Sequence, residues 1–178
     1  CVCNAGYFGA SCARTTLAQQ SRVTARRALL SSLSELLIAE YPQQETVTSW
    51  IGMLTSIVQV NDELSNESGQ ELVTVLQTIM AAAQTGAVPT EVVQGLSSSI
   101  GSIPTYLKPS QATSAAAYQA YFENVMRTVL QQYCELLASD LTVQQQVLAI
   151  EPTFRVVTSS FYVRDGTSIS APLLPIEQ

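Results

Sequence analysis

The spacing of apolar residues changes character twice along this chain. From about residue 14 to residue 140, apolar side chains recur every three or four positions, which places them on one face of an α-helix. The first twelve residues hold three cysteines instead, and β-branched and aromatic residues become frequent after about residue 141. The pattern predicts a mainly α protein, a bundle of four to five helices with a cysteine-rich N-terminal tail and two or three short C-terminal β-strands.

Breaks in the periodic pattern divide the helical part into five segments. Pro42 ends the first segment, and the polar residues 61–65 separate the second from the third. We expect helices over residues 14–40, 45–60, 66–84, 89–100 and 111–139. Gly86 is placed to end the third helix in the left-handed conformation, and Ser110 is placed to cap the last. Residues 101–109 contain two prolines and are predicted to be a loop.

Four of the helices carry apolar stripes that we expect to face the core. In the first, the stripe comprises Leu17, Val23, Leu29, Leu30, Leu33, Leu36 and Leu37. In the second, it comprises Val47, Trp50, Ile51, Leu54, Ile57 and Val58. In the third, it comprises Leu72, Val73, Leu76, Ile79, Met80 and Ala83. In the last, it comprises Ala115, Tyr118, Phe122, Val125, Met126, Val129, Tyr133, Leu136 and Leu137, and we expect the tyrosines to pack in the core with their hydroxyls at its rim.

The C-terminal part is predicted to form strands over residues 153–158 and 160–164. Asp165 and Gly166 follow as a turn signal, and Ile169 and residues 173–174 would continue extended structure. Two or three short strands cannot bury both of their faces alone. We therefore expect them to lie on the helices, to pair with sequence beyond residue 178, or to pair with another chain.

Composition and charge exclude several classes of function. Apolar residues make up 47% of the chain, enough for a packed core, whereas charged residues make up 12%, about half the usual share. The net charge of −6 argues against nucleic-acid binding and against docking on anionic lipid. Histidine is absent, so the chain has no histidine base and no histidine metal ligand. No apolar run is long enough for a transmembrane helix, and no cofactor is expected.

Cys1, Cys3 and Cys12 form a cluster with the spacing C-x-C, five residues, Gly, two residues, Cys. Disulfide bonding, a zinc site and coincidence are the alternatives; a zinc site would need four ligands, usually in C-x₂₋₄-C pairs. The spacing and the turn between Gly6 and Gly9 resemble the C-terminal half of an EGF-like module. The resemblance implies that Cys3 bonds to Cys12 and that Cys1 bonds to a cysteine outside this chain segment. It implies no calcium or other metal here, because EGF calcium ligands lie in the other half.

Two further residues bear on the compartment. Cys134 lies in a helical pattern, where it is a small buried hydrophobe or the partner of Cys1 or of a cysteine elsewhere. A catalytic role is not expected for Cys134 without a histidine. Asn66 begins the sequence Asn-Glu-Ser, an N-glycosylation acceptor that we expect to face solvent. The acceptor and the EGF-like spacing together predict a secretory-pathway protein.

Residues 57–72 carry a second resemblance. They combine an apolar helix end, a polar break with the sequence Asp-Glu-Leu-Ser, and a capped amphipathic helix. This is similar to subdomain A of the GAIN domains of adhesion-type receptors, and to the region after the REJ segment in polycystin-type and sperm-receptor-type proteins. Residues 150–164 resemble the entry into the β-rich subdomain B. We therefore expect part of an EGF-like module at 1–13, a GAIN-A-like helical domain at 14–140, and an incomplete β-rich subdomain at 141–178. The GAIN autoproteolysis motif is absent, so no such residue is assigned.

Three functions compete. The first is a non-catalytic extracellular module of a large cell-surface or ciliary protein, which binds other chains or neighbouring domains. The second is a structural subunit of an extracellular fibre, such as a flagellar hair (mastigoneme) or matrix, joined through strand edges. The third is an enzyme, for which the carboxylates of Asp62, Glu63, Glu67, Glu71, Asp140 and Glu151 are available. The acids beside helix starts complement the helix dipole without any reaction, and we expect no enzymatic activity.

Overall fold

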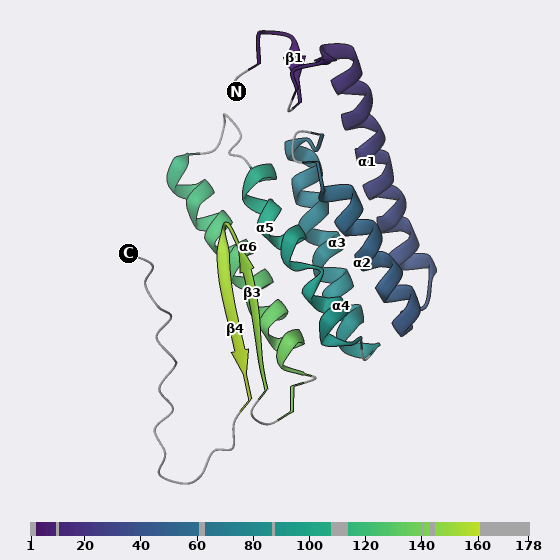
Figure 1. The fold of residues 1–178 in the computed structure, drawn as a ribbon, viewed down its shortest axis with the longest axis vertical. Helices are drawn as coiled ribbons and strands as arrows, with labels where there is room; N and C mark the ends of the chain where they lie inside the picture. The colour runs from purple at the N-terminus through teal and green to yellow at the C-terminus, as the bar shows by residue number, and fades with distance from the viewer. Residues whose placement is uncertain are drawn as a thin grey trace.

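The computed structural model describes residues 3–9, 11–60, 63–86, 88–107, 114–139, 141–142 and 145–160, without the side chain of Asn66. Within these ranges the chain is mainly helical, as predicted, with a small antiparallel sheet near each end (Figure 1). The helices are α1 (Thr16–Ala39), α2 (Gln44–Val58), α3 (Asn66–Thr85), α4 (Thr90–Gln94), α5 (Ser97–Tyr106) and α6 (Ala115–Ala138). The strands are β1 (Tyr7–Phe8), β2 (Arg14–Thr15), β3 (Gln146–Glu151) and β4 (Phe154–Ser159).

Helix α3 lies at the centre of the bundle, in contact with α1, α2, α5 and α6. The predicted stripes of α2 and α3 are confirmed, because every one of their residues is buried. Val75 of α3 is also buried, although it lies outside the predicted stripe. A helix with neighbours on several sides buries more than one face, which the spacing of a single stripe does not reveal.

The stripe of α1 is only partly buried, so the prediction is corrected there. Leu30 and Leu33 lie in the core, but Leu17 and Leu29 are 78% and 56% exposed. Helix α1 packs against α2 and α3. The face that it buries there is narrower than the apolar stripe predicted from the sequence. In α6 the predicted stripe residues of the second half are buried, namely Val129, Tyr133, Leu136 and Leu137, whereas Ala115 at the start of the helix is exposed. Tyr133 is buried completely instead of reaching the rim of the core.

Three helices begin at hydroxyl caps. The side chains of Thr15, Ser65 and Ser114 accept hydrogen bonds from backbone amides in the first turns of α1, α3 and α6. The predicted cap Ser110 lies outside the described residues. Gly86 ends α3 as predicted, but its φ of −86° is not left-handed, so that part of the prediction is wrong.

The predicted loop at 101–109 is wrong for most of its length. Helix α5 continues to Tyr106 with Pro104 inside it. A proline within a helix costs about 3 kcal/mol, because it removes a hydrogen bond and crowds the preceding turn. Burial of Ile100, Ile103 and Tyr106 contributes roughly 1.5–3 kcal/mol for each side chain, which outweighs that cost.

The C-terminal strands form a hairpin that lies on the helices. β3 pairs with β4 in antiparallel register, with Glu151 opposite Phe154 across a two-residue turn. β3 contacts α5 and β4 contacts α6 (Figure 1). The prediction of a strand at 153–158 is confirmed, whereas the strand that precedes it was not foreseen. Most of the predicted strand at 160–164 and all that follows lie outside the described residues.

Gly101 permits the hairpin to approach α5 closely. A Cβ atom at this position would lie 3.3 Å from the side chain of Glu151. The hydroxyl of Thr153 donates a hydrogen bond to the carbonyl of Gly101, and that of Ser97 donates to the Glu151 carboxylate at 2.7 Å. These contacts fix the turn end of the hairpin against one face of α5.

Candidate functional site: a clamp on the N-terminal segment

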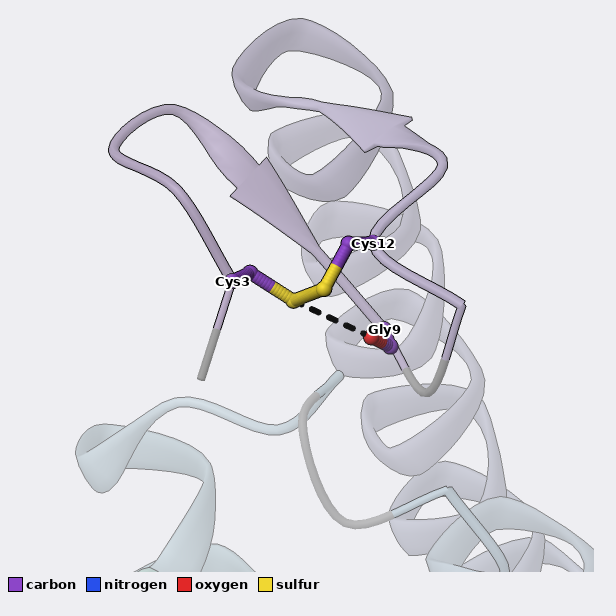
Figure 2. The surroundings of a disulfide bond; sticks show 3 residues. All are labelled: Cys3, Gly9 and Cys12. Atoms are coloured by element: carbon purple, nitrogen blue, oxygen red, sulfur yellow. Dashed lines mark hydrogen bonds between the residues drawn. A yellow bond between two sulfur atoms is a disulfide. The ribbon is translucent and has the colours of Figure 1, made fainter. Parts of the chain in front are cut away.

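The N-terminal segment is closed by a disulfide between Cys3 and Cys12, as the EGF-like resemblance implied (Figure 2). Their Cα atoms lie 5.3 Å apart. Gly6 and Gly9 have φ values of +83° and +86°, the left-handed conformation that glycine adopts without a steric penalty. The carbonyl oxygen of Gly9 lies 3.3 Å from the Cys3 sulfur, which carries no proton and therefore makes a close contact rather than a hydrogen bond. Cys1 lies outside the described residues.

Gly9 has a second role, because the side chain of Arg14 packs directly against it. A Cβ atom at Gly9 would lie 2.5 Å from the Arg14 guanidinium. The turn of the disulfide-bonded segment thus positions Arg14, the first residue of β2, and β2 is followed directly by α1. The arginine is directed towards the loop between α2 and α3, where it meets Glu63.

Glu63 is the centre of a charged cluster that joins three parts of the chain, namely β2, α1 and the loop between α2 and α3. Its carboxylate accepts hydrogen bonds from Arg14 at 2.6 Å, Arg22 at 3.0 Å and Arg26 at 2.8 Å. Only 2% of Glu63 is exposed to solvent. We call these four residues the Glu63 cluster. Three guanidinium groups on one buried carboxylate compensate its charge, which would otherwise be costly to bury.

Arg26 extends the cluster to the end of α2. One of its terminal nitrogens donates to the carbonyl oxygens of Ser56 and Ile57, at 2.8 and 2.7 Å. Both carbonyls belong to the last turn of α2, where helices leave carbonyl groups without intrahelical partners. Arg26 therefore binds the end of one helix and the loop that follows it, from a position on α1.

The electrostatics of Glu63 favour its ionised form. Burial by itself would raise the pKa of this carboxyl, but the hydrogen bonds and charges of Arg26 and Arg22 outweigh it and hold the pKa below its ordinary value. The group is charged at neutral pH, and the clamp on the N-terminal segment is an ionic one.

From the sequence, Glu63 is predicted only to be one of several carboxylates in a favourable place beside a helix start. Its adjacent residue Asp62 lies outside the described residues. One signal could have found the cluster: four of the seven arginines of the chain fall within residues 14–27. The fourth, Arg27, forms an ion pair with Glu67 at 2.9 Å, in which both side chains are mostly exposed.

Two other predicted site residues, Asn66 and Cys134, belong to helices α3 and α6. Asn66 forms the first residue of α3, and its side chain is outside the described part of the chain. Ser68, the third residue of the glycosylation acceptor, is buried with its hydroxyl 3.1 Å from that of Ser65. Cys134 is a free, half-buried thiol packed against the core. Burial and the charge of Glu135 raise its pKa, so it favours the neutral thiol.

Two further candidate carboxylates, Asp140 and Glu151, come from the C-terminal part of the chain. Asp140 is outside the described residues. Glu151 lies at the hairpin turn. The pKa of Tyr133 is raised to about 12, mainly because this phenol is buried and, to a smaller extent, because the negative charge of Glu151 is near. Among the described residues, no three His, Cys, Asp or Glu side chains gather closely enough to hold a metal ion.

The described part of the surface has three depressions that bear on the site, and each lies between named elements of the fold. A cavity of about 380 Å³ lies between α2, α5 and the hairpin turn, lined by hydroxyl groups and Glu151. An apolar groove of about 460 Å³ runs between α1 and α2 beside Leu29 and Met53. A polar groove of about 620 Å³ is lined by residues of α3 and α6. None of the three is lined by a residue of the Glu63 cluster.

Comparisons with protein-family models, with curated proteins and with solved structures found no match for this chain. Its helices, over the ranges that the structure describes, are too short or too polar to cross a membrane.

Proposed function

We propose that this chain is a non-catalytic extracellular module that holds its neighbours in a set orientation and presents a protein-binding surface. The Glu63 cluster carries the proposal. A short segment closed by one disulfide has little core of its own, so its orientation depends on contacts with the adjoining domain. Arg14 provides such a contact, because it joins the disulfide-bonded segment to a carboxylate buried against α1 and α2.

The parent protein that we propose is a large cell-surface or ciliary protein of the polycystin or adhesion-receptor type. The order of a disulfide-bonded segment, a helical bundle and a β-hairpin supports kinship with EGF-like and GAIN-type ectodomains. The low content of charged residues also supports a contact role, since fewer charges must lose water when two surfaces meet.

Nuclear magnetic relaxation of the full chain tests the orienting role. In the native chain, we expect backbone order parameters of about 0.85 both in the described part of residues 3–15 and in the helices. In Glu63→Gln, the values for the N-terminal segment should fall towards about 0.6, while those of α2 and α3 stay high.

Glu67→Gln is the matched control, because it removes an exposed ion pair from the same end of the bundle. It should leave the order of the N-terminal segment unchanged. Native-like order in Glu63→Gln would show that the cluster does not orient the segment, and the proposed function would lose its support.

A fibre subunit is the second candidate, favoured by the exposed apolar side chains on the hairpin. A fibre subunit should assemble reversibly as its concentration rises, through the edge or outer face of β3 and β4. Sedimentation velocity of the full chain over a wide concentration range separates the two functions. A monomer at all concentrations contradicts the fibre role.

A further inference from the structure

The cavity between α2, α5 and the hairpin turn is lined mainly by side chains that carry oxygen atoms. Its volume of about 380 Å³ is in the range of sites that bind small molecules. Glu151 contributes a carboxylate, and we call this space the Glu151 cavity. The hydroxyl groups come from α2, α5 and the turn between β3 and β4: Thr55, Ser98, Ser102, Thr105 and Thr153.

Several of these hydroxyl groups have already donated their protons. Thr55 and Ser102 each donate to a backbone carbonyl of the preceding helical turn, at 2.8 and 2.7 Å. Thr153 donates to the carbonyl of Gly101 at 3.2 Å. A hydroxyl group has one proton and two lone pairs, so these three oxygens can accept hydrogen bonds from a ligand but have no proton left to donate.

Glu151 adds a negative charge to these acceptors. The hydroxyl of Ser97 donates to one of its carboxylate oxygens at 2.7 Å. Within the described residues Glu151 forms no ion pair, whereas Glu63 pairs with three arginines. No arginine or lysine is among the described residues that line the cavity. A half-buried carboxylate with a neutral partner favours the approach of a cation.

We propose that the Glu151 cavity binds the ammonium group of a lysine side chain from a partner protein. An ammonium group has three donors and no acceptor, which complements a lining of hydroxyl lone pairs and one carboxylate. The inference rests on the proposed function, because it assigns a partner chemistry to the protein-binding module.

The geometry at Glu151 favours an ammonium group over a guanidinium group. A guanidinium binds a carboxylate best through two parallel hydrogen bonds, one to each oxygen. One oxygen of Glu151 already accepts a hydrogen bond from Ser97, so a compact point charge suits the other oxygen better. A calcium ion draws on several carboxylates, and Glu151 is the only one among the described residues that line the cavity.

A titration of the full chain with capped amino acids, followed by amide nuclear magnetic resonance, tests the proposal. The probe is Nα-acetyl-lysine N-methylamide. We expect saturable shifts of the Gly101 and Thr153 amides, with a dissociation constant on the order of 1–10 mM, since one side chain makes few contacts. The amide of Glu63 should not shift. The arginine counterpart should bind more weakly, and the norleucine counterpart, which has no charge, should not bind.

Two variants identify the groups that bind the probe. Glu151→Gln keeps the shape and an acceptor for Ser97, and it should weaken binding by about tenfold or more. Thr55→Val removes one oxygen from the wall formed by α2 and should weaken binding by about two- to tenfold. Glu45→Gln is the matched control, because it removes an exposed carboxylate at the other end of α2 and should leave binding unchanged.

Three results would overturn the proposal. The first is the absence of saturable shifts at Gly101 and Thr153 with the lysine probe. The second is equal binding of the norleucine probe or of Glu151→Gln, which would show that charge plays no part. The third is tighter binding of the arginine probe, or saturable shifts with calcium chloride alone, which would assign the cavity to another cation. None of these results bears on the order of the N-terminal segment, so the proposed function and this inference fail separately.

Discussion

At the scale of single residues, Glu63 connects the ionisation of one carboxyl to the stability of the whole chain. Its pKa is lowered in the folded protein from the value of 4.5 for an unperturbed glutamate. A lowered folded-state pKa means that the ionised group stabilises the fold. That contribution is complete above about pH 4.5 and is lost as the pH falls through the folded-state pKa.

We expect Glu63→Gln to lower the free energy of unfolding at pH 7 by roughly 2–3 kcal/mol, since it leaves three arginines without their shared anion. The difference from the native protein should shrink as the pH falls below about 4.5, because protonated Glu63 resembles glutamine. Urea unfolding from pH 3 to pH 7 measures both effects. A difference that is constant over this range would show that the charge of Glu63 is not responsible.

At the scale of elements, two helical glycines differ in what surrounds them. A Cβ atom at Gly69 of α3 would lie 3.0 Å from the backbone of Tyr106, where the end of α5 crosses α3. A Cβ atom at Gly52 of α2 would meet nothing within 4 Å. Gly69 thus sets the distance between two helices, whereas Gly52 lies on the floor of the apolar groove between α1 and α2.

Alanine substitutions at these glycines should have opposite effects. Gly69→Ala should destabilise the protein by about 1–3 kcal/mol, because the backbone of α5 must move. Gly52→Ala should stabilise it by up to about 1 kcal/mol, since alanine favours the helix and has room. Thermal unfolding of both variants provides the measurement, and a gain of stability in Gly69→Ala would contradict the close helix crossing.

At the scale of the whole molecule, the proposed compartment makes two chemical predictions about protein secreted from eukaryotic cells. Peptide mapping without reduction should recover Cys3 linked to Cys12 and Cys134 as a free thiol. Enzymatic deglycosylation should change the mass of the peptide that contains Asn66. The hydroxyl of Ser68 is buried against Ser65, so we expect the glycan to be attached before α3 folds.

Asn66→Gln supplies the control, because it removes the acceptor and should abolish the mass change. Free thiols at both Cys3 and Cys12 in the secreted protein would remove the basis of the EGF-like assignment. Absence of a glycan would leave the disulfide as the remaining support for an extracellular location.

The local sequence pattern was sufficient to predict those parts of the fold that depend on residues close together in the chain. The stripes of α2 and α3 and the glycine turns beside the disulfide follow from spacing and backbone preference. The extension of α5 through Pro104 does not follow from local pattern, because burial of the apolar side chains of α5 outweighs the local penalty of a proline. The position of β3 was missed for a related reason, since its continuous apolar run carries no alternation to mark it as a strand.

By itself, the sequence determined the helical class, the core faces of α2 and α3, and the turns that accompany the disulfide. These depend on residues close together in the chain. Only the tertiary structure decided that Glu63 forms ion pairs with three arginines and that the backbone of Tyr106 packs closely against Gly69. It also decided that the hairpin exposes apolar side chains. Such contacts join residues that are about 37 to 49 positions apart, and their energy depends on where whole helices pack rather than on any local period.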